Sequence, residues 1–111
     1  MDDQCWFVVK TNSRAEKLVA ERFIAAGIVH YLPIKRELKQ WKDRRKWVDE
    51  VLIKGYVFVF CTAAERRLVF DVFGVVRFLY FAGKIAVVTQ REIEVLQVFC
   101  DKSYRHNSSA T

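Results

Sequence analysis

The densest group of chemically active side chains lies between residues 35 and 46, where basic residues surround an aromatic one. Lysine and arginine occur seven times in this stretch and acidic residues twice, so its charge of +5 nearly equals the +6 of all 111 residues. Trp41 and Trp47 flank the most basic part. Cations bind phosphates and aromatic rings stack on unpaired bases, so this composition favours nucleic-acid binding. A solvated basic hairpin, with both rings folded onto a sheet, is the alternative.

Two groups of basic residues are therefore candidates for contact with nucleic acid. The first comprises Lys42, Arg44, Arg45 and Lys46 of the basic stretch. The second is Arg14 and Lys17, which are three positions apart and share one face of a predicted helix. Glu16 and Glu21 lie between and beyond them and reduce the local positive charge.

Catalysis finds little support in the sequence. His30 lies beside a predicted strand, and His106 lies in a polar C-terminal segment. Neither belongs to a recognisable motif with a nucleophile and an acid, and the four glycines form no phosphate-binding loop. We therefore expect no enzymatic activity, no cofactor and no small-molecule substrate.

The three cysteines are too far apart in the chain to form a recognisable metal-binding or disulfide pattern. Cys5, Cys61 and Cys100 each lie among apolar residues, which is typical of small, reduced core side chains. Reduced thiols predict a cytoplasmic protein, and the lack of an apolar run of membrane-spanning length and the acidic N-terminus predict no membrane partner. We also expect a monomer.

Hydrophobic periodicity predicts the elements that position these residues. Capping boxes at Ser13–Glu16, Thr62–Glu65 and Thr89–Glu92 indicate three helices, the first ending at Gly27 and the second at Gly74. The third helix directs Ile93, Leu96, Phe99 and Cys100 toward the core. Strands are predicted at 5–10, 28–38, 47–53, 55–61, 75–81 and 85–88, with a polar hairpin tip at 39–46.

These elements predict one α+β domain over residues 1–100. Successive strands with helices between them favour a mainly antiparallel, four-stranded sheet flanked by about three helices, with the basic hairpin added. Residues 101–111 are polar and without pattern, so we expect a tail or the start of a linker there.

The predicted strand at 55–61 is almost wholly aromatic and β-branched. Its segment Lys54–Val59, Lys-Gly-Tyr-Val-Phe-Val, resembles the RNP1 motif of RNA-recognition folds, whose aromatics stack on unpaired bases. Tyr56 and Phe58 lie on one face of the strand. One hypothesis is therefore a free-standing single-stranded RNA- or DNA-binding domain, and core packing or a protein interface is the alternative.

A longer set of ordered segments resembles the N-terminal domain, or NGN domain, of NusG-type transcription elongation factors. The similarity covers roughly residues 5–100. The charged hairpin is most similar to the specialised UpxY-like and RfaH-like antiterminators. The segments that carry the resemblance are Trp6–Lys10, Arg14–Lys17, Tyr31–Pro33, Ile53–Val59, Gly74–Phe78 and Ile85–Val88.

The resemblance implies an NGN fold and a non-enzymatic factor that binds RNA polymerase and reduces pausing or termination. In that family an apolar patch docks on the β′ clamp helices, and some members contact the non-template DNA strand. Carried over by motif, the patch comprises Ile53, Lys54, Tyr56, Phe58 and Phe81, with Lys54 where the family usually has proline.

The start of the second helix, at Arg66 and Arg67, is implied to face the opposite, β lobe of the polymerase. The family also carries a C-terminal KOW domain. The residues after position 100 are too few to form one, so we expect either a single domain of a longer protein or a short protein.

Overall fold

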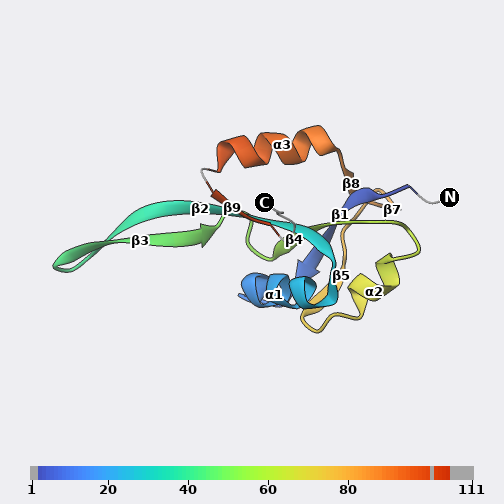
Figure 1. Cartoon of the computed structure of the whole chain (residues 1–111), viewed down its shortest axis with the longest axis horizontal. Helices are drawn as coiled ribbons and strands as arrows, with labels where there is room; N and C mark the ends of the chain where they lie inside the picture. The colour runs from blue at the N-terminus through green and yellow to red at the C-terminus, as the bar shows by residue number, and fades with distance from the viewer. Residues whose placement is uncertain (1–2, 101, 106–111) are drawn as a thin grey trace.

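The computed structural model describes residues 3–100 and 102–105. An antiparallel sheet forms the middle layer, with helices α1 and α2 on one side and α3 on the other (Figure 1). A two-stranded hairpin extends from one end of the sheet and stretches the molecule to 55 × 31 × 26 Å. The predicted α+β class and antiparallel pairing are confirmed.

The sheet contains more strands than predicted. Its strand order is β3-β2-β4-β1-β5, with β8 added to β1 and β9 added to β2, while β6 and β7 pair only with each other. The strands are β1 (Cys5–Thr11), β2 (Val29–Trp41), β3 (Arg44–Val51), β4 (Tyr56–Cys61), β5 (Val75–Phe78), β6 (Tyr80–Phe81), β7 (Lys84–Ile85), β8 (Val87–Val88) and β9 (Lys102–Arg105). The single strand predicted over 75–81 is thus divided between two sheets.

Helix α3 begins as its capping box predicts, whereas α2 begins at Arg66, after the Thr62–Glu65 turn rather than directly after Thr62. The helices are α1 (Glu16–Ala26), α2 (Arg66–Phe70) and α3 (Gln90–Phe99). Thr89 and Glu92 exchange side-chain and backbone hydrogen bonds of 2.9 and 3.1 Å. Thr62 and Glu65 form the same reciprocal pair just before α2. Helix α2 ends at Phe70, four residues before the predicted stop at Gly74.

The capping box predicted at Ser13 is wrong. Helix α1 begins at Glu16, and no side chain caps its first residue. The backbone just before α1 bonds instead to a distant part of the chain, since the N–H of Asn12 donates to the carbonyl of Gly74. The buried Glu16 carboxylate instead accepts a hydrogen bond from the N–H of Gly55, which satisfies both groups.

Alternating side chains place one core on each face of the sheet. Phe7 and Val57 pack with α1 and α2, in a cluster that includes Val19, Ala20, Phe23 and Val69. Trp6 and Phe58 pack on the other face with Ile93 of α3. The Trp6 indole also donates to the Gln90 side chain at 2.8 Å, which holds α3 over this face.

The hairpin tip predicted at 39–46 is wrong, because the turn contains only Lys42 and Asp43. Strand β2 continues to Trp41, and β3 pairs with it from Ile34↔Val51 to Trp41↔Arg44. Charged side chains hide the strand in the sequence, since both faces of a projecting ribbon are in water and need no apolar alternation. We call residues 35–50 of this ribbon the basic arm.

Two further features differ from the prediction. Phe99 is exposed, whereas Ile93 and Cys100 of the same helical stretch are buried. The polar segment after residue 100 contains a strand, β9, which pairs with β2 between Tyr31 and Ile34. Backbone hydrogen bonds hold such an edge strand without an apolar pattern in its sequence. Positions 101 and 106–111 lie outside the described residues.

Candidate functional site

The structure distributes the predicted site residues over three places. The basic arm carries Lys42, Arg44, Arg45 and Lys46 at its distal end. A cleft at the start of α1 collects Arg14, Lys17 and Lys54. Strand β4, the residues just before it and the β6–β7 hairpin carry the predicted apolar docking residues, and α2 carries Arg66 and Arg67.

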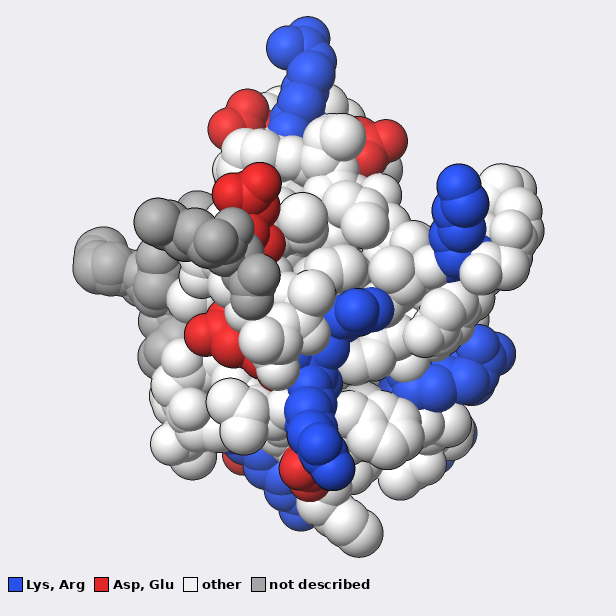
Figure 2. All heavy atoms as spheres, turned by 90° about the vertical axis from the view of Figure 1, so that its right-hand side faces the viewer, with Lys and Arg blue, Asp and Glu red and all other residues white. Residues whose placement is uncertain are grey.

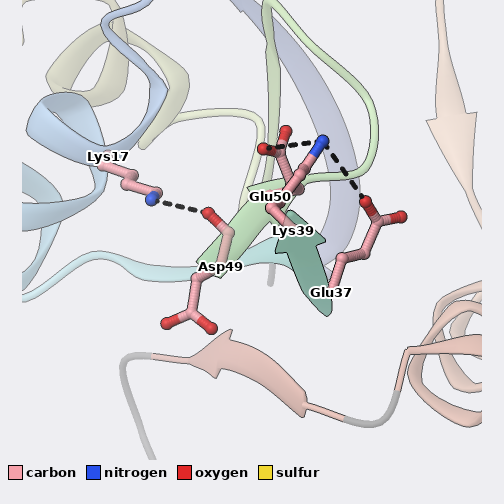
Figure 3. Close-up of polar contacts among 5 residues, drawn as sticks. All are labelled: Lys17, Glu37, Lys39, Asp49 and Glu50. Carbon is pink, nitrogen blue, oxygen red and sulfur yellow. Dashed lines mark hydrogen bonds and ion pairs between the residues drawn. The ribbon is translucent and has the colours of Figure 1, made fainter. Parts of the chain in front are cut away.

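Two lysine contacts, one with each flanking helix, hold the base of the arm. Lys17 Nζ of α1 donates to the backbone carbonyl of Asp49 at 3.0 Å (Figure 3). Lys35 Nζ lies 5.0 Å from the ring centroid of Phe99 on α3, within cation–π range. The arm therefore leaves the sheet between two helices that both contact it.

Ion pairs neutralise the base of the arm. Lys39 lies between Glu50 and Glu37, with N···O distances of 3.6 and 3.7 Å (Figure 3). Arg36 pairs with Asp49 at 3.5 Å. Toward the turn the situation changes: Lys42, Arg44, Arg45 and Lys46 are exposed, and no ion pair involves them within the described part of the chain.

Both tryptophans of the arm are open to solvent. Trp41 is 56% exposed and Trp47 is 60% exposed, so the alternative in which both rings fold onto the sheet is wrong. Trp41 lies beside the turn, directly opposite Arg44, and Trp47 lies opposite Leu38. The arm thus offers exposed rings and free cations together, which is the combination that single-stranded nucleic acids bind.

A second basic region surrounds a cleft of about 640 Å³ between α1, the end of β3 and the start of β4. Arg14, Lys17 and Lys54 line it, together with Lys10, which the sequence did not single out. Strand pairing explains why Lys10 lines the cleft, because Lys10 lies opposite Tyr56, at the start of β4, in the β1–β4 register. Glu16, Asp49 and Glu50 also line the cleft, so its net charge is only slightly positive.

Helix α3 covers part of the face of β4 that carries Tyr56 and Phe58. Phe58 is only 6% exposed and stacks on Tyr31 with ring centroids 6.2 Å apart. Ile53 and Tyr56 are half-buried at the edge of the same cluster, which α3 covers through Ile93 and Leu96. Lys10 Nζ lies 5.4 Å from the Tyr56 ring centroid. The open aromatic platform that an RNP1-type strand requires is therefore not present on this face.

The remaining docking residues lie elsewhere on the surface. Phe81 belongs to the β6–β7 hairpin and is 79% exposed. Arg66 and Arg67 lie on α2, on the sheet face opposite Tyr56. Arg66 is half-buried, with its guanidinium 5.3 Å from the Phe7 ring centroid, whereas Arg67 is exposed.

The end of the molecule opposite the arm has a different surface. Figure 2 shows this end, where lysines and arginines stand among uncharged side chains and a few acidic ones. The net positive charge of the chain is therefore not confined to one continuous patch, and the unpaired cations of the arm lie at the other end (Figure 1).

The cysteines and acidic residues offer no metal centre within residues 3–100 and 102–105: no three of the side chains that bind metals lie close enough together. No disulfide joins Cys5, Cys61 and Cys100. Burial and then the nearby Glu65 carboxylate raise the pKa of the Cys61 thiol from 9.0 to about 11, so this thiol is protonated at neutral pH. None of the helices in the described part is long and apolar enough to cross a membrane.

Comparisons with known proteins agree with the resemblance in the sequence. A family model described as "NusG: Transcription termination factor nusG" matches residues 4–97. Seventeen chains of solved structures match, among them one titled "Domain interaction in Thermotoga maritima NusG". That match has a TM-score of 0.57 and 27% identity, and covers 82% of this chain and 54% of that one. This chain thus spans about half the length of the Thermotoga protein. No curated protein sequence matches it.

Proposed function

The chain belongs to the NusG family of transcription factors, and we propose that it binds the β′ clamp helices of RNA polymerase and reduces pausing or termination. The family match over residues 4–97 carries this proposal, because it includes every residue assigned to the docking patch. The basic arm and the Arg14–Lys17 region are proposed to contact the non-template DNA strand, and Arg66 and Arg67 the opposite lobe.

The exposed part of the docking patch supports a protein contact. Phe81 projects from its hairpin, and Tyr56 and Ile53 are half-buried at the open edge of the α3-side cluster. Lys54 is exposed beside them and adds a positive charge at the rim. Aromatic anchors surrounded by charged residues are typical of protein interfaces. Phe58 is too deeply buried to contact a partner directly, and we assign it to supporting Tyr56 from below.

A pull-down with the isolated β′ clamp helices tests this surface. Wild type is expected to bind, and Tyr56→Ala and Phe81→Ala to weaken binding by about 2 kcal/mol or more, roughly thirty-fold. Phe73→Ala is the matched control, because Phe73 is a similarly exposed phenylalanine, 75%, in the loop after α2. Equal losses in all three variants, or none in Tyr56→Ala and Phe81→Ala, would contradict the assignment of the patch.

The effect on elongation needs a separate measurement. Purified polymerase is expected to spend less time at a defined pause site when the chain is added, and Phe81→Ala to abolish this change. Longer pauses or more termination with wild type would contradict an antitermination role while leaving polymerase binding intact.

A free-standing nucleic-acid binder that uses β4 is not favoured. Such a domain needs Tyr56 and Phe58 on an open sheet face, whereas Phe58 is buried beneath the α3-side cluster.

A further inference from the structure

The register of the basic arm sorts its side chains onto two faces of different chemistry. Residues directly opposite each other in an antiparallel ribbon share a face, and the face alternates at each step along a strand. One face of the distal arm carries the pairs Trp41↔Arg44 and Lys39↔Lys46. The other face carries Gln40↔Arg45 and Leu38↔Trp47. We call them the Trp41 face and the Trp47 face.

The Trp41 face concentrates positive charge around an exposed ring. Arg44 lies directly across from Trp41, and Lys39 lies directly across from Lys46. Like charges in this position destabilise a strand pair. The Lys39 ammonium is drawn toward Glu37 and Glu50 nearer the base, whereas Arg44 and Lys46 have no acidic partner among the described residues. An anionic ligand here would relieve the repulsion.

The Trp47 face lacks this concentration of charge. Trp47 pairs with the apolar Leu38, and Arg45 lies opposite the neutral Gln40. The next basic residue on this face, Arg36, is already paired with Asp49. Arg45 is thus a single cation on a surface that is otherwise uncharged in its distal part, even though the sequence places it in one run with Arg44 and Lys46.

We propose that the Trp41 face binds a single DNA strand, with one unpaired base stacked on Trp41 and neighbouring phosphates on Arg44 and Lys46. The Trp47 face takes no part in this contact. The inference rests on the proposed function, because a polymerase transcription bubble supplies the unpaired strand. A duplex keeps its bases stacked on one another, and an indole ring could contact a base face only at the cost of unstacking it, so an unpaired strand fits this face better.

Matched variants on the two faces test the proposal. The probe is a fluorescently labelled, mixed-sequence DNA strand of about 12 nucleotides, titrated with the chain at low salt and followed by anisotropy. Trp41→Ala is expected to weaken binding about five-fold or more, and Trp47→Ala less than about two-fold. Arg44→Ala is expected to reduce the salt dependence of binding more than Arg45→Ala does, although both remove one exposed charge from adjacent positions.

Several results would overturn the proposal. They are no binding by wild type, equal losses in Trp41→Ala and Trp47→Ala, or binding to RNA or duplex DNA of the same sequence that is as tight or tighter. Unfolding midpoints of the variants equal to that of wild type establish that the fold is intact. The clamp-helix pull-down separates the two proposals, because Trp41→Ala is expected to bind the clamp helices as wild type does.

Discussion

The Glu16 carboxylate and the backbone N–H of Gly55 form a hydrogen bond of 2.5 Å across 39 residues of sequence. The bond joins the first turn of α1 to the Lys54–Gly55 turn that precedes β4. Both the cleft at the start of α1 and the proposed docking residues next to Lys54 depend on this junction. The buried carboxylate therefore helps to fix the relative position of two of the three candidate surfaces, together with the hydrogen bond of 2.9 Å from the Thr11 N–H to the Gly55 carbonyl.

We expect Glu16→Ala to lower the free energy of unfolding by about 1.5–3 kcal/mol, because it leaves the half-buried N–H of Gly55 without its charged acceptor. Glu16→Gln keeps an acceptor oxygen, and we expect a smaller loss. Urea denaturation measures both. Glu21→Ala, an exposed glutamate on the same helix, is the control and is expected to change stability by less than about 0.5 kcal/mol. An equal loss in the control would assign the effect to the helix rather than to the bond.

Alanine substitutions at two glycines with positive φ distinguish the cost of backbone strain from the cost of a steric clash. Gly27 ends α1 at φ 75°, and no heavy atom lies within 4 Å of an added Cβ, so Gly27→Ala is expected to cost about 1–2 kcal/mol. Gly74 has φ 102°, and an added Cβ would lie 2.7 Å from Val19 Cγ2. We expect Gly74→Ala to cost about 1–3 kcal/mol more than Gly27→Ala, because overpacking adds to the strain. If the two variants had the same midpoint of thermal unfolding, the predicted clash with Val19 would be refuted.

The two lysines at the base of the arm are expected to stabilise it locally. Lys17→Ala removes the hydrogen bond to the Asp49 carbonyl, and Lys35→Ala removes the contact with Phe99. Each change is expected to speed amide hydrogen exchange in β3 by about two- to five-fold, with little effect on β1 and β4. Lys84→Ala, on the exposed β6–β7 hairpin, is the control. Unchanged exchange in β3 would show that pairing with β2 alone holds the arm.

Cys61 is expected to resist alkylation until the pH approaches 11. A folded-state pKa raised from 9.0 to about 11 keeps the thiol protonated over this range, while the unfolded chain already forms the thiolate near pH 9. The folded state therefore loses stability from this group as the pH rises from 9 to 11. Iodoacetamide labelling followed by peptide mass spectrometry measures the reactivity. Labelling of the folded chain at pH 9 as fast as in concentrated urea would contradict the shift.

The apolar elements of this fold were predictable from local patterns, and the elements exposed to water were less so. The short aromatic and β-branched run Trp6–Val9 and the Thr89–Glu92 capping box correctly indicate β1 and α3, because burial and capping leave a signature in neighbouring residues. The distal half of β2 lacks such a signature. Its faces are both solvated, so a run of charged residues looks like a loop although the backbone is paired.

In the candidate sites, too, some features were predictable from local sequence and others were not. The sequence identified the basic arm and the aromatic strand as chemically distinct segments. It did not show that Arg44 and Arg45 point to opposite faces, that Lys10 joins the cleft or that α3 closes over Phe58. Each of these facts depends on strand register or on packing between residues far apart in the chain. Glu16 was misassigned for the same reason, since its partner Gly55 is distant in sequence.

Strand β2 begins in the sheet, where Tyr31 lies opposite Phe58, and continues without interruption to the tip of the arm. The face of the arm on which the Trp41 side chain lies is therefore set by whether an odd or an even number of residues separates Trp41 from the core. Relatives that lengthen the arm by two residues in each strand would keep the outer ring on the same side, whereas an odd number would exchange the sides. Variation in arm length within the family is thus expected to occur in even steps wherever the ligand remains the same.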